Sequence, residues 1–290
     1  MTQYSPKYTK LLYLGPKGSY SDIAKNKFKE YYSENIEFIE QNSISQIIEY
    51  LVNDGSDTTT AILPIENSIE GVVRETQDKL SYLAENGYFI YSETQLAISH
   101  ALIGYADNMD NITTITSHPQ ALAQCREFIH KNFNKDIELK PALSTSNGVE
   151  SLSDNKPNIV AIGNEYCAKL YNIPIIKNNI NDEKNNTTRF ILISKKIPTK
   201  TDNNKISVVF STENSPGALN KALTILEKHE INLSYIESRP SRKKLGEYIF
   251  YADFAGFIDD NNISLALIEL QNQVKTLNIL SHGAVIKNVD

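Results

Sequence analysis

Several residue types are scarce in this 290-residue chain, and the shortages exclude whole classes of protein. There is no tryptophan, and the two cysteines, Cys125 and Cys167, supply neither a disulfide framework nor a zinc-binding spacing, which indicates a reducing compartment. Twelve glycines and ten prolines are too few for a collagen-like or low-complexity chain. Apolar runs such as residues 62–65 are far shorter than the roughly 18 residues that cross a bilayer.

Positive charge is also scarce, because 29 lysines and arginines face 35 aspartates and glutamates, for a net charge of −6. Without a block of basic residues, the chain offers a nucleic acid no electrostatic footprint. The first residues lack the basic and apolar segments of a signal peptide. We therefore expect a cytoplasmic protein with neither a nucleic-acid nor a membrane partner.

Short apolar runs alternate with helical patterns from residue 10 to residue 194, an order typical of a parallel α/β sheet. Among these elements the pattern predicts helices at residues 21–32 and 119–130. Residues 195–204 are polar and lack periodicity, which predicts a linker. The rest follows the order βαββαβ of a ferredoxin-like unit. We therefore expect a larger region at residues 1–196, with a second α/β subdomain at about 92–177, and a separate domain at 205–290.

A glycine-containing segment at residues 14–21 joins a predicted strand to a predicted helix. Gly18 lets the backbone approach a ligand, and the free N–H groups of the helix start, capped by Ser19 or Ser21, can bind an anion. The segment matches neither a Walker loop nor a dinucleotide fingerprint. An ordinary tight turn with a helix cap would use the same residues.

A polar cluster at residues 64–71 follows a predicted strand, and parallel α/β sheets bind ligands at that end of their strands. The Asn67 amide and the Ser68 hydroxyl are suited to a small carboxylate. Capping or solvation also explains Glu66 and Glu70, and we favour that interpretation for Glu70.

His118 stands before Pro119 at the start of a predicted helix. Beside the positive helix end a neutral imidazole is favoured, so we expect a hydrogen-bond partner or a structural cap rather than a general base. Cys125 falls on the apolar face of that helix and is assigned to the core. The sequence contains no catalytic-triad elbow and no metal-ligand spacing, so we expect no metal.

Thr188 and Arg189 are neighbours at the start of another predicted strand. Successive side chains of a strand point to opposite faces, so only one of the two readily enters a given cleft.

Six segments in this order resemble the prephenate dehydratase family. They are Gly-Pro-Lys-Gly-Ser-Tyr-Ser at 15–21, Pro-Ile-Glu-Asn-Ser-Ile-Glu-Gly at 64–71, Ser-His-Pro-Gln-Ala-Leu-Ala-Gln-Cys at 117–125, Asn-Asn-Thr-Thr-Arg-Phe at 185–190, Gly-Ala-Leu at 217–219 and Glu-Ser-Arg-Pro at 237–240. The resemblance implies a two-lobed α/β catalytic region, like that of periplasmic binding proteins, and a C-terminal ferredoxin-like ACT domain. Because few residues precede the first predicted strand, we expect no fused chorismate mutase domain.

The resemblance further implies conversion of prephenate to phenylpyruvate, water and carbon dioxide in phenylalanine biosynthesis, without a cofactor. The enzyme must then supply orientation and a proton for the leaving hydroxyl. Thr188 matches the family's catalytic threonine. The implied substrate-binding residues are Gly18, Ser19, Ser21, Asn67, Ser68, His118, Gln120, Thr145 and Arg189. For Arg189 a second interpretation, in which it faces away and braces the subdomain interface, is the one we prefer.

Regulation by phenylalanine is implied by the C-terminal motifs, and ACT domains typically bind ligands between paired domains, so a homodimer or homotetramer is expected. The residues that match the phenylalanine signature are Gly217, Ala218, Leu219, Asn232, Leu233, Glu237, Ser238 and Arg239. From the residues alone, Gly217 and Leu219 are equally explained as turn and core.

Two other functions stay open. An arogenate dehydratase would use the same motifs on a substrate with an amino group in place of the keto oxygen. A non-catalytic amino-acid sensor would use the same architecture, but it would not require the Thr188 motif.

Overall fold

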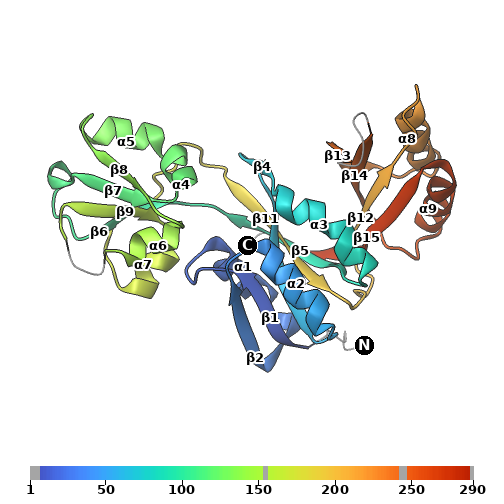
Figure 1. Ribbon diagram of the computed structural model, residues 1–290, viewed down its shortest axis with the longest axis horizontal. Coiled ribbons are helices and arrows are strands. Elements are labelled where there is room, and N and C mark those ends of the chain that lie inside the picture. Colours follow the sequence, from blue (N-terminus) through green and yellow to red (C-terminus); the bar gives the residue numbers. More distant parts are fainter. Residues whose placement is uncertain (1–6, 153–155, 242–246, 288–290) are drawn as a thin grey trace.

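The computed structural model describes residues 7–152, 156–241 and 247–287. Figure 1 shows three parts in a row: a second lobe at one end, a first lobe in the centre and a C-terminal unit at the other end. The first lobe comprises residues 7–97 and 187–194, the second lobe residues 101–177, and the C-terminal unit residues 204–286. This two-lobed α/β architecture with a βαββαβ unit is the predicted fold class.

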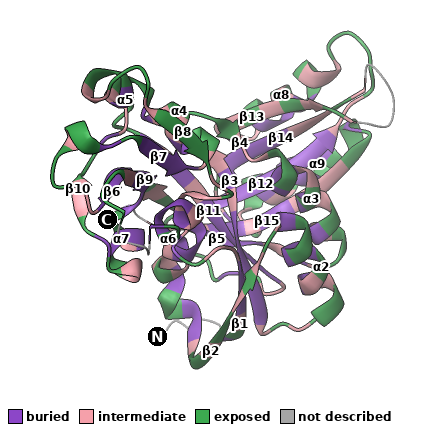
Figure 2. Ribbon diagram, turned by 60° about the vertical axis from the view of Figure 1, so that its left-hand side comes forward, coloured by how far each residue is buried: buried purple, intermediate pink, exposed green. Residues whose placement is uncertain are grey.

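The first lobe is built on a sheet in which β2, β1 and β3 run parallel, while β11 pairs antiparallel with β3 and β5. Its central strands are buried along most of their length, as Figure 2 shows. The elements are β1 (Tyr8–Leu14), α1 (Tyr20–Ala24), a 3-10 helix (Lys25–Tyr31), β2 (Tyr32–Gln41), α2 (Ile44–Asp54), β3 (Thr59–Asn67), β4 (Gly71–Val72), α3 (Arg74–Glu85), β5 (Phe89–Ala97) and β11 (Thr187–Ser194).

The second lobe has its own five-stranded sheet in the order β10-β6-β9-β7-β8. Residues 98–100 and 178–186 cross between the lobes side by side, because the Ile98 amide donates to the Asn186 carbonyl at 2.8 Å and the Ile180 amide to the His100 carbonyl at 3.0 Å. The elements are β6 (Ala101–Gly104), a 3-10 helix (Met109–Asn111), β7 (Thr114–Ser117), α4 (Pro119–Gln124), α5 (Arg126–Asn132), β8 (Glu138–Pro141), α6 (Thr145–Glu150), β9 (Ile159–Gly163), α7 (Glu165–Tyr171) and β10 (Ile175–Lys177).

The C-terminal unit follows the predicted order strand, helix, strand, strand, helix, strand. Its sheet continues that of the first lobe, because the end of β15 pairs with β5 through Val285 opposite Ser92 and Ile286 opposite Glu93. The elements are β12 (Asn204–Ser211), α8 (Ala218–Lys228), β13 (Leu233–Pro240), β14 (Tyr248–Ala255), α9 (Asn261–Gln273) and β15 (Thr276–Ile286).

The helix α2 shows how local sequence builds the core. The Ser43 hydroxyl accepts from the amide of Gln46 at 3.2 Å and caps the helix start, and Gly55 ends the helix with a left-handed φ of 63°. Between these caps, apolar side chains three and four residues apart form one buried face: Ile44, Ile47, Ile48 and Leu51.

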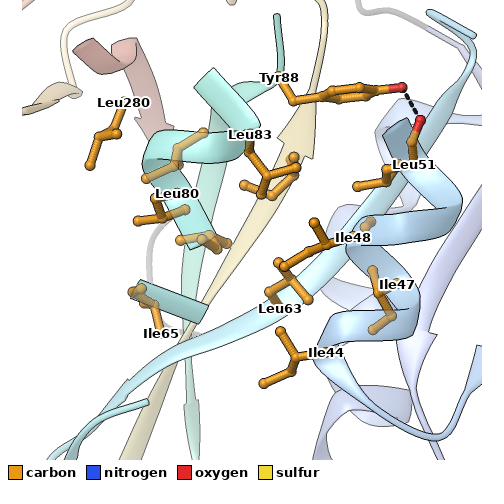
Figure 3. Close-up of a cluster of buried hydrophobic side chains, with 14 of the residues drawn as sticks. Ile44, Ile47, Ile48, Leu51, Leu63, Ile65, Leu80, Leu83, Tyr88 and Leu280 are labelled. Atoms are coloured by element: carbon orange, nitrogen blue, oxygen red, sulfur yellow. Dashed lines mark hydrogen bonds between the residues drawn. The ribbon is translucent and has the colours of Figure 1, made fainter. Parts of the chain in front are cut away.

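That face packs against α3 and the first-lobe sheet in the cluster drawn in Figure 3. Leu63 and Leu83 lie within the cluster and are fully buried. The Tyr88 hydroxyl donates to the Leu51 carbonyl at 2.5 Å, so the last turn of α2 gains a buried partner. The cluster also includes Val209, Tyr251, Leu280 and Ala284 of the C-terminal unit, so the first lobe and that unit share one core.

Two predicted helices are interrupted. The helix expected at 21–32 is α-helical only to Ala24, because Phe28 takes non-helical angles (φ −114°, ψ 18°) and is fully buried among tyrosines. The helix expected at 119–130 breaks at Cys125, and the Asp182 carboxylate accepts from the amides of Glu127 at 2.9 Å and Phe128 at 3.1 Å. Tertiary contacts thus override helical periodicity at both places.

Candidate active site

Thr188 and Asn67 lie opposite each other where β11 begins and β3 ends. The register of these strands shifts between Arg189 and Phe190, where Pro64 has no N–H to give the ladder. The Asn67 side-chain oxygen accepts from the amides of Ile69 and Glu70, both at 3.0 Å. Its nitrogen must therefore face the other way, and it donates to Thr188 Oγ1 at 2.9 Å.

This arrangement determines which hydrogen bonds the Thr188 hydroxyl can still make. Because the hydroxyl oxygen accepts from an amide, its own proton is left for another acceptor, and accepting one hydrogen bond polarises the hydroxyl as a donor. Thr188 is 9% exposed, so the hydroxyl works in a largely desolvated place. The site is therefore suited to donating a hydrogen bond, or relaying a proton, to an oxygen atom of a ligand.

Three further side chains extend this cluster, and sequence reasoning missed their roles. Asn67 Nδ2 also donates to Asn186 Oδ1 at 2.7 Å, and Asn186 Nδ2 donates to Gln124 Oε1 at 3.2 Å. Gln124 Oε1 also lies 3.0 Å from His100 Nε2. Gln124 and Asn186 belong to the family-like motifs at 117–125 and 185–190, which was a usable signal, whereas nothing in the sequence around His100 marks it.

Arg189 occupies the opposite face of β11 from Thr188, within a buried ion cluster. Its guanidinium bonds Glu93 at 3.0 Å, Asp253 at 2.9 Å and Glu66 at 3.3 Å. Lys205 adds a second cation, paired with Glu93 and 3.4 Å from Asp253. Arg189 thus faces away from Thr188, as the preferred interpretation expected, but the interface that it braces was predicted wrongly. It joins the first lobe to the C-terminal unit and not to the second subdomain, because Asp253 of β14 is its partner. Its role in binding substrate stays a prediction.

The charges of this cluster determine the pKa of Asp253. Burial on its own raises the pKa of that carboxyl, but the charges of Arg189 and Lys205 hold it below its usual range. Asp253 is therefore an anion in the folded protein.

The glycine-containing loop lies against the second lobe. The Gly18 amide donates to the Asp22 carboxylate at 2.8 Å, and the Gly18 carbonyl accepts from Asn164 at 2.8 Å and from Cys167 Sγ at 3.0 Å. A Cβ at Gly18, whose φ is +89°, would lie 2.6 Å from Ser146 Oγ. The residue is thus needed for close approach of the lobes, and its N–H is already engaged.

The other predicted substrate-binding residues are placed as follows. The Ser19 hydroxyl caps α1 and donates to the Leu14 carbonyl, and the Ser68 hydroxyl donates to the Asn185 carbonyl. His118 caps α4 through Nδ1, as its position predicted. Ser21 is buried, Gln120 is exposed and Thr145 is half-buried at the start of α6. In the part of the chain that the structure describes, Thr188 Oγ1 is hydrogen-bonded to Asn67 and to none of these six side chains.

The predicted phenylalanine-binding residues fall into two groups. Glu237 accepts from Gln77 at 2.9 Å, and Arg239 donates to Gln77 at 2.9 Å, so both engage α3 of the first lobe. The others lie elsewhere on the unit: Gly217 (φ +79°) precedes α8, Ala218 and Leu219 begin it, Asn232 and Ser238 are exposed, and Leu233 is half-buried on β13.

Within the described residues, no group of three or more histidine, cysteine, aspartate or glutamate side chains is arranged to hold a metal ion. Burial raises the pKa of the Cys125 thiol to about 12, so this cysteine is not a ready nucleophile. No helix among residues 7–152, 156–241 and 247–287 has the length and apolar character to cross a membrane.

The fold and the site together define a two-lobed α/β enzyme whose site is built from a hydroxyl and side-chain amides, with a βαββαβ unit attached. Comparison with known proteins agrees: residues 11–198 match the prephenate dehydratase family model and residues 206–270 match the ACT domain model. The chain belongs to the prephenate dehydratase family and is a carbon–oxygen lyase.

The chain is 42% identical over 274 residues to the prephenate dehydratase of Methanocaldococcus jannaschii, covering 93% of this chain and 96% of that protein. It is similar to the structure of prephenate dehydratase from Arthrobacter aurescens in complex with L-Phe, with a TM-score of 0.81, 28% identity and coverage of 94% and 89% of the two chains. A structure described as a novel type of quorum-quenching acylase has a TM-score of 0.80 and 25% identity, covering 96% of this chain and 98% of that chain.

Proposed function

We propose that the chain converts prephenate to phenylpyruvate with Thr188 as the catalytic residue. The observation that carries this proposal is the hydrogen bond from Asn67 Nδ2 to Thr188 Oγ1, because it leaves the hydroxyl proton free to donate. The Asn67 oxygen accepts from two backbone amides, which directs its nitrogen to Thr188 and to Asn186.

The reaction needs little more than orientation and a proton. The bond between the ring and its carboxylate breaks and carbon dioxide leaves, and the electron pair moves through the ring to expel the hydroxyl at the far end. The expelled oxygen takes a proton and departs as water, and the ring becomes aromatic. An alcohol is a very weak acid, so Thr188 stabilises the leaving oxygen by a hydrogen bond, or relays a proton to it, as the bond breaks.

Binding of the two substrate carboxylates is assigned to glycine and to polar side chains of the two lobes. Arg189 is engaged with three carboxylates on the other side of β11, so it is assigned to bracing instead. The proposed binding residues are Gly18, Ser19, Ser21, Asn67, Ser68, His118, Gln120 and Thr145. We also propose the domain division at 1–196 and 205–290 and a cytoplasmic location. For the second subdomain we propose a start after β5 instead of at about 92, because β5 pairs with β11 in the first-lobe sheet.

Feedback regulation by phenylalanine is assigned to the C-terminal unit. The proposed effector residues are Gly217, Ala218, Leu219, Asn232, Leu233, Glu237, Ser238 and Arg239. In the described part of the sheet β13 is an edge strand, and its Ile236 is 44% exposed, which supports pairing with a second copy in a homodimer or homotetramer.

Acyl transfer, suggested by the similarity to an acylase structure, is less well supported. A threonine nucleophile needs a base that removes its proton. In the described residues the hydrogen-bond partner of Thr188 Oγ1 is the Asn67 amide, which donates to it and cannot remove the hydroxyl proton. The geometry therefore favours proton donation.

The test is to incubate the purified chain with prephenate, or with arogenate, and to follow phenylpyruvate or phenylalanine. Thr188→Val, which keeps the shape without the hydroxyl, should lower kcat by about 100-fold or more, whereas Thr188→Ser should keep most activity. Equal rates for Thr188→Val and the wild type would remove Thr188 from the mechanism. Turnover of arogenate alone would identify arogenate as the substrate. Phenylalanine binding without turnover of either compound would support the non-catalytic amino-acid sensor.

A further inference from the structure

Gln124 is the point at which the second lobe reaches the Thr188 cluster. It is the last residue of α4, and its side chain contacts three residues outside that lobe. Its Nε2 donates to Glu70 Oε1 at 3.3 Å, and its Oε1 lies 3.2 Å from Asn186 Nδ2 and 3.0 Å from His100 Nε2. Glu70 follows β3, and His100 and Asn186 belong to the two crossover segments.

The direction of each hydrogen bond in this group follows from Glu70. An ionised carboxylate only accepts, so the Gln124 nitrogen faces Glu70 and the Gln124 oxygen faces the other two partners. Asn186 and His100 must then donate to that oxygen, which places the proton of a neutral His100 on Nε2. With its nitrogen committed to Gln124, Asn186 presents its oxygen to Asn67, whose nitrogen also donates to Thr188.

The surroundings of His100 favour the neutral form of its imidazole. It is 2% exposed, and burial lowers its pKa below the usual value. Its Nδ1 lies 3.3 Å from the Tyr20 hydroxyl, which itself donates to the Ser99 carbonyl at 2.7 Å, and the two rings meet edge to face with centroids 5.9 Å apart. Tyr20 and Gln124 thus hold the ring from the first and the second lobe respectively.

We propose that Gln124, held by His100, is a positioning residue that aligns the Thr188 hydroxyl through Asn186 and Asn67 when the second lobe lies in this arrangement. If the second lobe moved away, Gln124 would leave with α4, and Asn186 would lose the acceptor that fixes its amide. Alignment of Thr188 is thereby tied to the relative position of the lobes. This inference rests on the proposed function, because it requires Thr188 to act on the leaving oxygen.

The experiment measures kcat and KM for prephenate with variants of the full chain, Asn186→Ala among them. Gln124→Met removes the acceptor, and Gln271→Met, the same change on the exposed surface of α9, is the matched control. His100→Leu removes the N–H donor, whereas His100→Gln offers a side-chain N–H at a similar reach. Gln124→Met and His100→Leu should lower kcat about five- to tenfold, the size expected for one hydrogen bond, with KM changed less than about twofold.

Recovery of activity in the conservative variant distinguishes a positioning role of His100 from a packing role. His100→Gln should recover at least about half of the wild-type kcat, and the double variant Gln124→Met with Asn186→Ala should be no slower than the slower single variant. The inference would be overturned if kcat fell equally in His100→Gln and His100→Leu, or if kcat were unchanged in Gln124→Met. It would also be overturned if the loss in kcat/KM came from a raised KM and not from a lowered kcat. If His100→Leu failed to fold, the change at half-buried Gln124 would still decide the question. Failure of the proposed function looks different, because the wild type itself would then not consume prephenate.

Discussion

Removal of Arg189 separates its two possible roles, because the structure predicts a loss of stability rather than of substrate affinity. The cluster holds two cations, Arg189 and Lys205, and three carboxylates, Glu66, Glu93 and Asp253. Arg189→Met leaves Lys205 alone with three carboxylates, and the side chains of Glu93 and Asp253 are only 6% and 9% exposed. Breaking a buried pair by removing one partner costs about 3–5 kcal/mol, because the remaining charge is left without compensation.

Thermal and chemical unfolding of Arg189→Met should therefore show a large effect. At roughly 2–4 °C per kcal/mol, the melting temperature should fall by about 6–20 °C. The matched control is Lys10→Met, which removes an ion pair to Asp54 at 3.3 Å in which the lysine side chain is 37% exposed, and which should change the melting temperature little because exposed pairs contribute little to stability. Arg189→Lys should not restore stability, since an ammonium cannot reproduce the fork that spans three carboxylates.

The loss should also depend on pH. In the wild type the pKa of Asp253 is lowered, so this carboxyl contributes stability above its unfolded pKa of about 4, and that contribution is lost as the pH falls through the folded value. Without Arg189, burial should raise the pKa of Asp253 above the unfolded value. The difference in stability between wild type and variant should then be largest near neutral pH and shrink as the pH falls, first past the raised pKa of Asp253 in the variant and then past its lowered pKa in the wild type. An unchanged melting temperature together with a raised KM would refute this reasoning and return Arg189 to substrate binding.

Three further substitutions test other parts of the molecule. Tyr88→Phe removes the hydroxyl that donates to the Leu51 carbonyl and should lower the free energy of unfolding by about 1 kcal/mol, measured by urea titration. Gly18→Ala forces a Cβ to within 2.6 Å of Ser146 Oγ at a left-handed φ, so kcat/KM for prephenate should fall about tenfold, and unchanged kinetics would show that the lobes need not approach this closely. Glu237→Ala should raise the phenylalanine concentration that gives half-inhibition about tenfold, and parallel loss of turnover and inhibition would contradict the assignment of regulation to the C-terminal unit.

The sequence was sufficient for features that depend on neighbours along the chain. The alternation of strands and helices, the βαββαβ order and the cap formed by His118 are all local patterns, and the structure has them. The helix at 119–130 was predicted without its break at Cys125, because the cap that stabilises the second part comes from Asp182, more than 50 residues away.

Long-range polar contacts were the part that could not be predicted. The alternation of a strand places Arg189 on the face opposite Thr188, but its pairing with Asp253 depends on how β12, β14 and β15 join the first-lobe sheet, which no local pattern specifies. His100 lies in the short segment between β5 and β6, and its contribution depends on Gln124, whose Oε1 the crossover brings to 3.0 Å from His100 Nε2. The contacts of such residues depend on the register between strands and on the arrangement of the lobes, and neither can be predicted from local sequence.

The register between β3 and β11 connects the proposed catalytic residue to the ion cluster that reaches the C-terminal unit. Thr188 lies opposite Asn67, and Arg189 lies opposite Glu66, so two polar pairs stand side by side and face opposite ways. A displacement of β14 that moves Asp253 acts on Arg189, whose backbone is one peptide away from Thr188. A hydrogen bond weakens steeply as it bends, so the donor role proposed for Thr188 requires β11 to keep this position. Phenylalanine can act on this strand only if it binds one arrangement of the C-terminal unit more tightly than another.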